Sequence, residues 1–239
     1  MKTEYEYSVI IPVFNHWDLT AKCIDSVRVN SAKYNYEIVV VSNGSTDKTP
    51  ENLAHIQRQS LKNLSYYCCT EPLGGGPAIN LGFKVAKGRY LITLNNDTAI
   101  LHESWIRVLR KPFDDPSRKV GITGPLKLYS PEATCEFIVF FCAMLRADVG
   151  AKYNFLSEDF GWGYGEDIDL AKRMQKDGYE VAMVPEKFAL KPGQDGMWDG
   201  GFPIYHKGEE TVGEIPNWQG ITEDNRRKLN SIYGGLKHD

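Results

Sequence analysis

The chain lacks an apolar run long enough to cross a bilayer, and it lacks an excess of positive charge. Its 239 residues carry 28 Lys and Arg against 31 Asp and Glu, a net charge of −3. The opening MKTEYEYS is polar and unlike a signal peptide. These absences predict a cytoplasmic protein with no transmembrane segment and without the excess of positive charge that is typical of nucleic-acid binding. Peripheral contact with a membrane stays open.

Cysteine is scarce, and its spacing excludes the common zinc sites. The five cysteines are odd in number and contain no C-x-x-C pair. Since most of them stand in apolar segments, we expect reduced thiols, largely in the core.

Several nucleotide and hydrolase motifs are also missing. The chain has no G-x-x-x-x-G-K-[ST], no G-x-S-x-G, no H-E-x-x-H and no EF-hand spacing. The glycines of LGGGPAINLG do not form a G-x-G-x-x-G that opens a first helix, so a dinucleotide site is weakly supported. A nucleotide or sugar site of another design remains.

The segments that are present predict an α/β fold. Apolar strands alternate with helical patterns through the first half, with strands at 7–14, 36–42, 64–70 and 89–97 and helices from 18, from 49 and over 77–88, the last closed by Gly88. This alternation indicates a mainly parallel sheet with crossover helices. The second half is less regular. It contains a strand and turn at 119–129, a buried strand or strand pair at 136–146, a helix that Gly178 stops, and an irregular tail with a short final helix.

Polar or glycine-rich residues follow each of the first four strands, at 12–15, 42–47, 71–76 and 95–97. Loops are polar for ordinary reasons, so any one of them is weak evidence. Four at one edge favour a site, because ligands of open parallel sheets bind beyond the carboxyl ends of the strands. The last, Asn95-Asn96-Asp97, suits either a turn or a cation site.

A second group of candidate functional residues lies in FGWGYGEDIDL, residues 160–170. Trp162 and Tyr164 stand between glycines and suggest a loop that presents flat apolar faces. Glu166 and Asp167 open a helix, where the macrodipole favours ionised carboxylates. They are either ordinary helix-start residues or a proton acceptor for a substrate hydroxyl. Asp169 is expected to face solvent or a cap. Further along the chain, His206 is either structural or a ligand.

Together these motifs resemble inverting glycosyltransferases of family 2 with the GT-A fold, of the bacterial surface-polysaccharide, rhamnosyltransferase-like type. The likeness runs from about residue 7 to 212. It rests on SVIIPVFN, EIVVVSNGSTDKT, GGPAINLGFKVAKGRYLITLNNDT, VGITGPLKLY, GYGEDIDLAKRMQKDGYEVAMVPE and YHKGEET, in the family's order.

The resemblance implies one GT-A domain over 1–239, with a mostly parallel central sheet flanked by helices. A nucleotide-sugar-binding half would cover about 1–100, an acceptor-binding half about 101–212, and a tail 213–239. The implied activity moves a sugar from a UDP- or dTDP-sugar to a hydroxyl of a glycan or lipid-linked glycan, with inversion in a single displacement.

The resemblance also implies roles for individual residues. Asp97 and His206 would bind a divalent cation, Mn²⁺ or Mg²⁺. Asp167 would be the base, with Glu166 as its alternative, and Trp162 and Tyr164 would contact the acceptor. The donor would contact Pro12, Val13, Phe14, Asn15, Ser42, Gly44, Gly75, Asn80, Asn95 and Asn96.

The chain departs from the family pattern at two places. Ser42 stands where an aspartate usually contacts the nucleotide base, and Asn95 and Asn96 occupy positions that are often acidic. The alternatives are a nucleotidyltransferase or a non-catalytic module that binds a nucleotide or sugar. Nucleotidyltransferases usually carry a glycine-rich basic loop after the opening strand, and this chain lacks one. A non-catalytic module is disfavoured because the chain retains Asp97, Glu166, Asp167 and His206.

Overall fold

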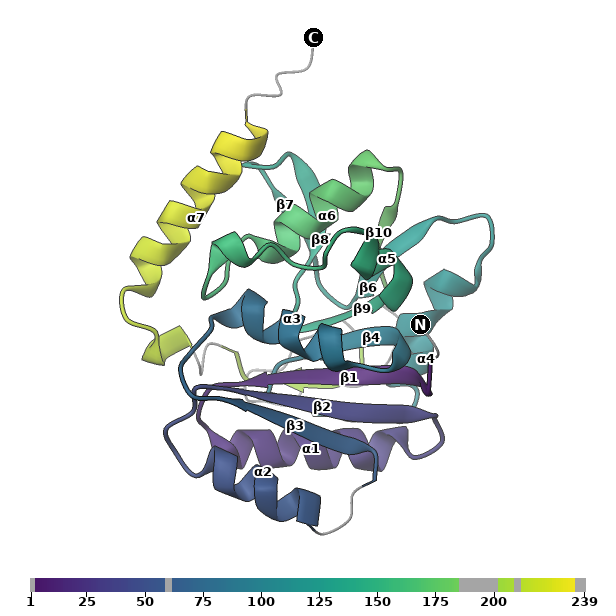
Figure 1. Cartoon of the computed structure of the whole chain (residues 1–239). Coiled ribbons are helices and arrows are strands. Elements are labelled where there is room, and N and C mark those ends of the chain that lie inside the picture. The colour runs from purple at the N-terminus through teal and green to yellow at the C-terminus, as the bar shows by residue number, and fades with distance from the viewer. Residues whose placement is uncertain (1–2, 59–61, 185–201, 209–211, 235–239) are drawn as a thin grey trace.

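A seven-stranded sheet forms the centre of the molecule (Figure 1). The computed structural model describes residues 3–58, 62–184, 202–208 and 212–234. The strand order is β10-β6-β9-β4-β1-β2-β3, and within this sheet only β9 runs antiparallel to its neighbours. The strands are β1 (Tyr5–Val13), β2 (Tyr36–Asn43), β3 (Leu64–Cys69), β4 (Gly88–Leu94), β6 (Val120–Gly124), β9 (Cys142–Arg146) and β10 (Glu180–Met183). The predicted mainly parallel α/β fold is confirmed.

Helices cover both faces of the sheet, and two small sheets stand apart from it. In Figure 1, α1 and α2 lie on one face of β1–β3 and α3 lies on the other. The helices are α1 (Trp17–Ser31), α2 (Thr49–Arg58), α3 (Gly75–Val85), α4 (Trp105–Arg110), α5 (Ala147–Lys152), α6 (Glu166–Lys176) and α7 (Trp218–Tyr233). The short turns are η1 (Lys111–Asp114), η2 (Glu158–Phe160) and η3 (Val212–Glu214). The two small antiparallel sheets pair β5 (Thr98–Ile100) with β11 (Ile204–His206), and β7 (Lys127–Ser130) with β8 (Cys135–Ile138).

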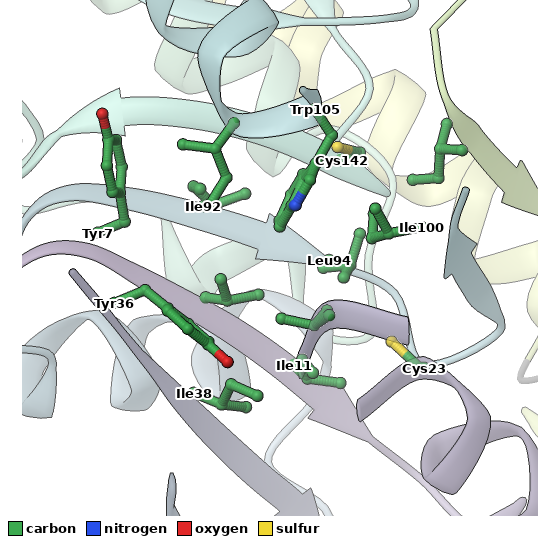
Figure 2. Packing of buried hydrophobic residues seen from close by; sticks show 14 of the residues in the cluster. Tyr7, Ile11, Cys23, Tyr36, Ile38, Ile92, Leu94, Ile100, Trp105 and Cys142 are labelled. Atoms are coloured by element: carbon green, nitrogen blue, oxygen red, sulfur yellow. The ribbon is translucent and has the colours of Figure 1, made fainter. Parts of the chain in front are cut away.

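The core has two parts because alternate residues of a strand point to opposite faces. Val9 and Ile11 of β1 join the cluster that α1 and α4 cover, which Figure 2 shows around Trp105. Ile10 joins the cluster under α3, α6 and α7. Both faces of the first strands are therefore buried, as their continuous apolar runs predict.

Three details of the expected elements were wrong or incomplete. Helix α3 ends at Val85, not at Gly88, since Ala86 is already extended. Gly88 instead opens β4, where a Cβ would lie 2.5 Å from the backbone nitrogen of Ser8. The final helix, α7, is 16 residues long and not short. The apolar segment at 136–146 is two strands, β8 and β9, which belong to different sheets.

The expectations for cysteine and membrane segments can be stated for the described residues. All five cysteines are free; Cys68 is exposed, Cys69 is half-buried and the other three are buried. None of the described helices combines the length and apolarity that crossing a bilayer requires. Residues 235–239 of the expected tail lie outside the described residues, as do the ends of two motifs, at 185–186 and 209–211.

Candidate active-site cavity

A cavity of about 430 Å³ opens at the carboxyl edge of the sheet. It is bounded by the ends of β1, β2 and β4, the start of α3, the loop before α6 and the segment before α7. Its lining is Pro12, Val13, Phe14, Asn43, Gly75, Ile79, Asn95, Asn96, Leu128, Phe137, Val139, Phe140, Phe141, Trp162, Gly163, Tyr164, Glu166, Asp167, Ile168, His206, Ile215 and Trp218. The expected gathering of polar strand ends at one edge is thus found, together with a large apolar wall.

Six of the ten residues expected to contact the donor line this cavity: Pro12, Val13, Phe14, Gly75, Asn95 and Asn96. Gly75 opens α3 and is close-packed, because a Cβ there would lie 2.6 Å from the carbonyl oxygen of Trp162. Asn96 is buried and donates its side-chain amide to Thr20 at 3.1 Å, which ties the end of β4 to α1.

The other four expected donor residues do not line the cavity. Asn15 binds the 45–47 turn, and its Oδ1 accepts from the backbone nitrogen of Thr46 at 2.8 Å. Ser42 is buried inside the sheet. Gly44 has φ 75°, and a Cβ there would lie 2.4 Å from the nitrogen of Pro72. Asn80 is buried and holds α3 to the backbone of Leu156 through two hydrogen bonds.

Asp97 and His206 face each other; His206 lines the cavity, whereas Asp97 is buried beside it and is not part of the lining. Nε2 of His206 lies 3.2 Å from Oδ1 of Asp97, and neither atom makes a well-aligned hydrogen bond. The other oxygen, Oδ2, accepts from the backbone nitrogen of Gly208 at 3.0 Å. The imidazole stacks on Phe141, with ring centroids 4.4 Å apart. The pairing of β11 with β5 brings these residues together, since His206 is in register with Thr98, the neighbour of Asp97.

Glu166 and Asp167 form a buried carboxylate pair at the start of α6, and both line the cavity. Oδ1 of Asp167 accepts from the backbone nitrogen of Ile168 at 2.8 Å. Oε2 of Glu166 is buried without a hydrogen-bond partner. The two side chains therefore differ in how far the protein stabilises their ionised forms.

Burial raises the pKa of both carboxyls, whereas the helix start alone was expected to favour their ionised forms. Desolvation is the largest cause for each, and the nearby charge of Asp167 raises the pKa of Glu166 further. Backbone N–H groups, that of Ile168 first, oppose the rise for Asp167. Removal from water outweighs the macrodipole here.

The loop that carries Trp162 and Tyr164 crosses one side of the cavity. Trp162 packs edge-on against Phe14, with ring centroids 5.4 Å apart, so the loop before α6 touches the end of β1. Gly161, Gly163, Tyr164 and Gly165 all have positive φ. The loop thus depends on backbone conformations that favour glycine.

Asp169 does not face solvent, contrary to expectation. It is buried, it pairs with Arg173 at 2.8 Å, and it accepts a hydrogen bond from the hydroxyl of Tyr233. Its side chain joins α6 to α7, and it is not part of the cavity lining.

The model of the glycosyl transferase family 2 matches residues 8–134. The chain belongs to this family. The match covers β1 through the turn before β8 and so includes the strand ends and Asp97, whereas the carboxylate pair and His206 lie beyond it. The expected family and fold are confirmed.

Curated relatives of this family 2 chain match short segments of it. A poly(ribitol-phosphate) beta-glucosyltransferase of Bacillus spizizenii is 34% identical over 102 residues, 42% of this chain and 16% of that protein. The O-antigen biosynthesis protein RfbC of Myxococcus xanthus is 30% identical over 129 residues, 54% of this chain and 10% of that protein. The matches thus span a small part of these longer relatives.

Solved structures of low identity share the fold. GalNAc-T7 with UDP, GalNAc and Mn²⁺ gives a TM-score of 0.66 at 14% identity, over 76% of this chain and 42% of that one. The mannosyltransferase PcManGT from Pyrobaculum calidifontis, in complex with GDP-Man and Mn²⁺, gives 0.64 at 16% identity, over 98% of this chain and 76% of that one. Both are GT-A transferases, and the likeness establishes the fold alone.

Sequence reasoning missed several residues of the family 2 cavity. Asn43 lines it beside the buried Ser42, and its side chain accepts from the nitrogen of Leu73 at 2.7 Å. Phe141 stacks on His206, and its segment was expected to form a buried strand or strand pair. Trp218 lines the cavity from α7, and no motif marks it in the sequence.

Proposed function

We propose that the chain is an inverting glycosyltransferase that moves a sugar from a UDP- or dTDP-sugar to a hydroxyl of a glycan or lipid-linked glycan. The observation that carries the proposal is the cavity, which His206 lines beside the strand ends and which Glu166 and Asp167 line from α6. A metal-binding end and a proton-accepting end on one cavity are what a metal-dependent displacement at a sugar carbon requires.

Asp97 and His206 fit a divalent cation. Oδ1 and Nε2 are buried, face each other and lack well-aligned hydrogen bonds, so both are available as ligands. Carboxylate oxygen and imidazole nitrogen suit Mn²⁺, and carboxylate suits Mg²⁺. Among the described residues, no group of three or more His, Cys, Asp or Glu side chains is placed to hold a metal ion, so the donor's diphosphate would supply further ligands. Two structural neighbours were solved with Mn²⁺. The chemistry that such a cation supplies is neutralisation of charge on the leaving diphosphate.

Asp167 is the proposed base. Its carboxylate accepts the N–H of Ile168, which fixes its orientation, while burial brings its pKa closer to neutrality than that of an ordinary aspartate. A base works best when its pKa lies near the working pH. Glu166 has an oxygen with no partner, so a shared proton falls first on Glu166 and leaves Asp167 ionised. Glu166 remains the alternative base.

The polar strand ends and the apolar wall suggest how the two substrates divide the cavity. Asn95 would face the donor at the end of β4, beside Asn43 and Asn96, whose side chains also bond within the protein. The flat faces of Trp162 and Tyr164 would contact the acceptor sugar from the loop before α6. Ser42 lies beneath the lining, so we assign the contact with the nucleotide base to its neighbour Asn43.

Calorimetric titration tests the donor site. Nucleoside diphosphates and nucleotide sugars would be titrated into the protein, once with Mn²⁺ and once with EDTA. Each compound would be tested in a uridine, a thymidine and a guanosine form, so that the three bases serve as controls for one another. The proposal expects binding of UDP or dTDP that EDTA weakens. Absence of nucleotide binding under both conditions would contradict it.

A further inference from the structure

The loop before α6, residues 160–165, is held by contacts from α7. This loop carries Trp162 and Tyr164 and leads directly into Glu166. Helix α7 (yellow in Figure 1) is separate from the central sheet and lies against the part of the chain that contains this loop. It also lies outside the residues that the family model matches.

Asn225 of α7 makes the central contact. It is only 5% exposed, and its Nδ2 donates to the carbonyl oxygens of Phe160 and Gly163, each at 2.8 Å. One amide group thus uses both of its hydrogens on two backbone groups of the same loop. The span between these two carbonyls contains Trp162.

Other α7 side chains extend the same contact. Nε of Arg226 donates to the hydroxyl of Tyr164 at 2.8 Å, and its guanidinium lies 5.0 Å from the ring centroid. Leu229 packs so closely that a Cβ on Gly165 would lie 3.3 Å from its Cδ1. Tyr233 donates its hydroxyl to Asp169 on α6. The helix therefore contacts the loop at both ends and the helix that follows it.

We infer that Asn225 is a positioning residue, which fixes the loop of residues 160–165 so that Trp162 and Glu166 face the acceptor. The loop needs such an anchor because four of its six residues, Gly161, Gly163, Tyr164 and Gly165, have positive φ, and residues 161–165 form no helix or strand of their own. The inference rests on the proposed function, because it gives the loop its task in sugar transfer.

The test compares Asn225→Asp with Asn230→Asp, the same change at an exposed position of the same helix. At position 225 the carboxylate is isosteric but has no hydrogens to donate, and it places negative charge against two carbonyl oxygens. We expect amide hydrogen exchange of residues 160–165 to rise by about tenfold or more, as for a lost buried hydrogen bond. Exchange in β1 and β4 should stay unchanged and so reports that the fold is intact. Asn230→Asp should match the wild type.

Activity is followed as release of nucleoside diphosphate from UDP- and dTDP-sugars, with free and polyprenyl-linked saccharides as acceptors. Asn225→Asp should lower kcat/KM for the acceptor by about tenfold or more, while affinity for UDP with Mn²⁺ stays within about twofold of the wild type. A purely structural role would lower both together. Arg226→Gln, at an exposed position, should change acceptor kinetics in the same direction and to a smaller extent.

Three results would overturn the inference: unchanged exchange in residues 160–165 of Asn225→Asp, faster exchange with unchanged acceptor kinetics, or an equal loss of UDP affinity and acceptor kinetics. Failure of the proposed function is read separately, from a wild-type protein that binds no nucleotide and releases none. In that case the exchange data still decide whether Asn225 holds the loop, while its task in sugar transfer would be refuted.

Discussion

Replacing Asp167 with Asn separates catalysis from stability. The amide oxygen of Asn can still accept the N–H of Ile168, so the local geometry is kept. The charge is lost, and with it the proposed proton acceptor. A positioned general base contributes about 10²–10⁴ in rate, so we expect transfer to fall by that factor, about 3–5 kcal/mol in the barrier. UDP affinity with Mn²⁺ should be unchanged.

The thermal stability of Asp167→Asn should be equal to or higher than that of the wild type. Burial raises the pKa of Asp167 in the folded protein, so its ionised form costs folding free energy at neutral pH, about 1.4 kcal/mol for each unit of the rise. The neutral amide removes that cost, and the difference fades as pH falls from the raised pKa toward the ordinary aspartate value, because only the folded protein takes up the proton in that range. We expect an equal or higher melting temperature at pH 7.5.

Asp169→Asn is the matched control. This buried carboxylate is two residues away, pairs with Arg173 and Tyr233, and does not line the cavity. Its loss should cost about 1–3 kcal/mol of stability and change transfer less than about tenfold. Equal loss of UDP binding and transfer in Asp167→Asn, or full activity with Asn at position 167, would refute the assignment of the base.

Three further predictions concern pH, metal and packing. Because burial raises the pKa of Asp167, kcat should fall on the acid side at a pH above the ordinary aspartate value of about 3.9; an acid limb near that value would contradict the assignment. Asp97→Asn, and His206→Phe, which keeps an aromatic ring for stacking, should each reduce Mn²⁺-dependent UDP affinity by at least about tenfold and leave affinity in EDTA unchanged by calorimetry. Gly75→Ala should lower transfer by displacing the loop before α6, since its Cβ would lie 2.6 Å from a loop carbonyl, whereas Gly213→Ala, with nothing within 4 Å, should not. Equal activity of the two alanine variants would contradict the close packing.

The central sheet could be predicted from sequence because its strands are continuous apolar runs. Tyr36–Asn43 is buried along its whole length, and the polar residues after it mark the strand end. Since parallel strands share an edge, the gathering of these ends followed from topology alone.

Helix α7 could not be predicted at its full length from the apolar pattern. Its buried residues are Asn225, Leu229 and Tyr233, four positions apart, and the first is polar. The burial of Asn225 depends on carbonyl groups more than sixty residues away in the chain. The same limit applies to Asp169, whose partner Tyr233 is 64 residues distant. Long-range pairing of polar groups leaves no local periodicity.

The roles of individual polar residues could not be predicted from the sequence either. Ser42 and Asn43 are neighbours on β2, yet only Asn43 lines the cavity. Asn80 was expected at the donor; its side chain anchors α3 to Leu156 and is not part of the cavity lining. Which of two adjacent polar residues faces the cavity depends on strand register and loop path, and neither is encoded in a short motif.

The most direct test follows the sugar by NMR. The nucleotide sugar that the protein binds would be incubated with Mn²⁺ and the saccharide acceptors, and the anomeric signal of the transferred sugar would be compared with that of the donor, for wild type and Asp167→Asn. The account predicts a product of inverted anomeric configuration from the wild type and almost none from the variant. Retained configuration, or no consumption of a nucleotide sugar that the protein binds, would contradict it.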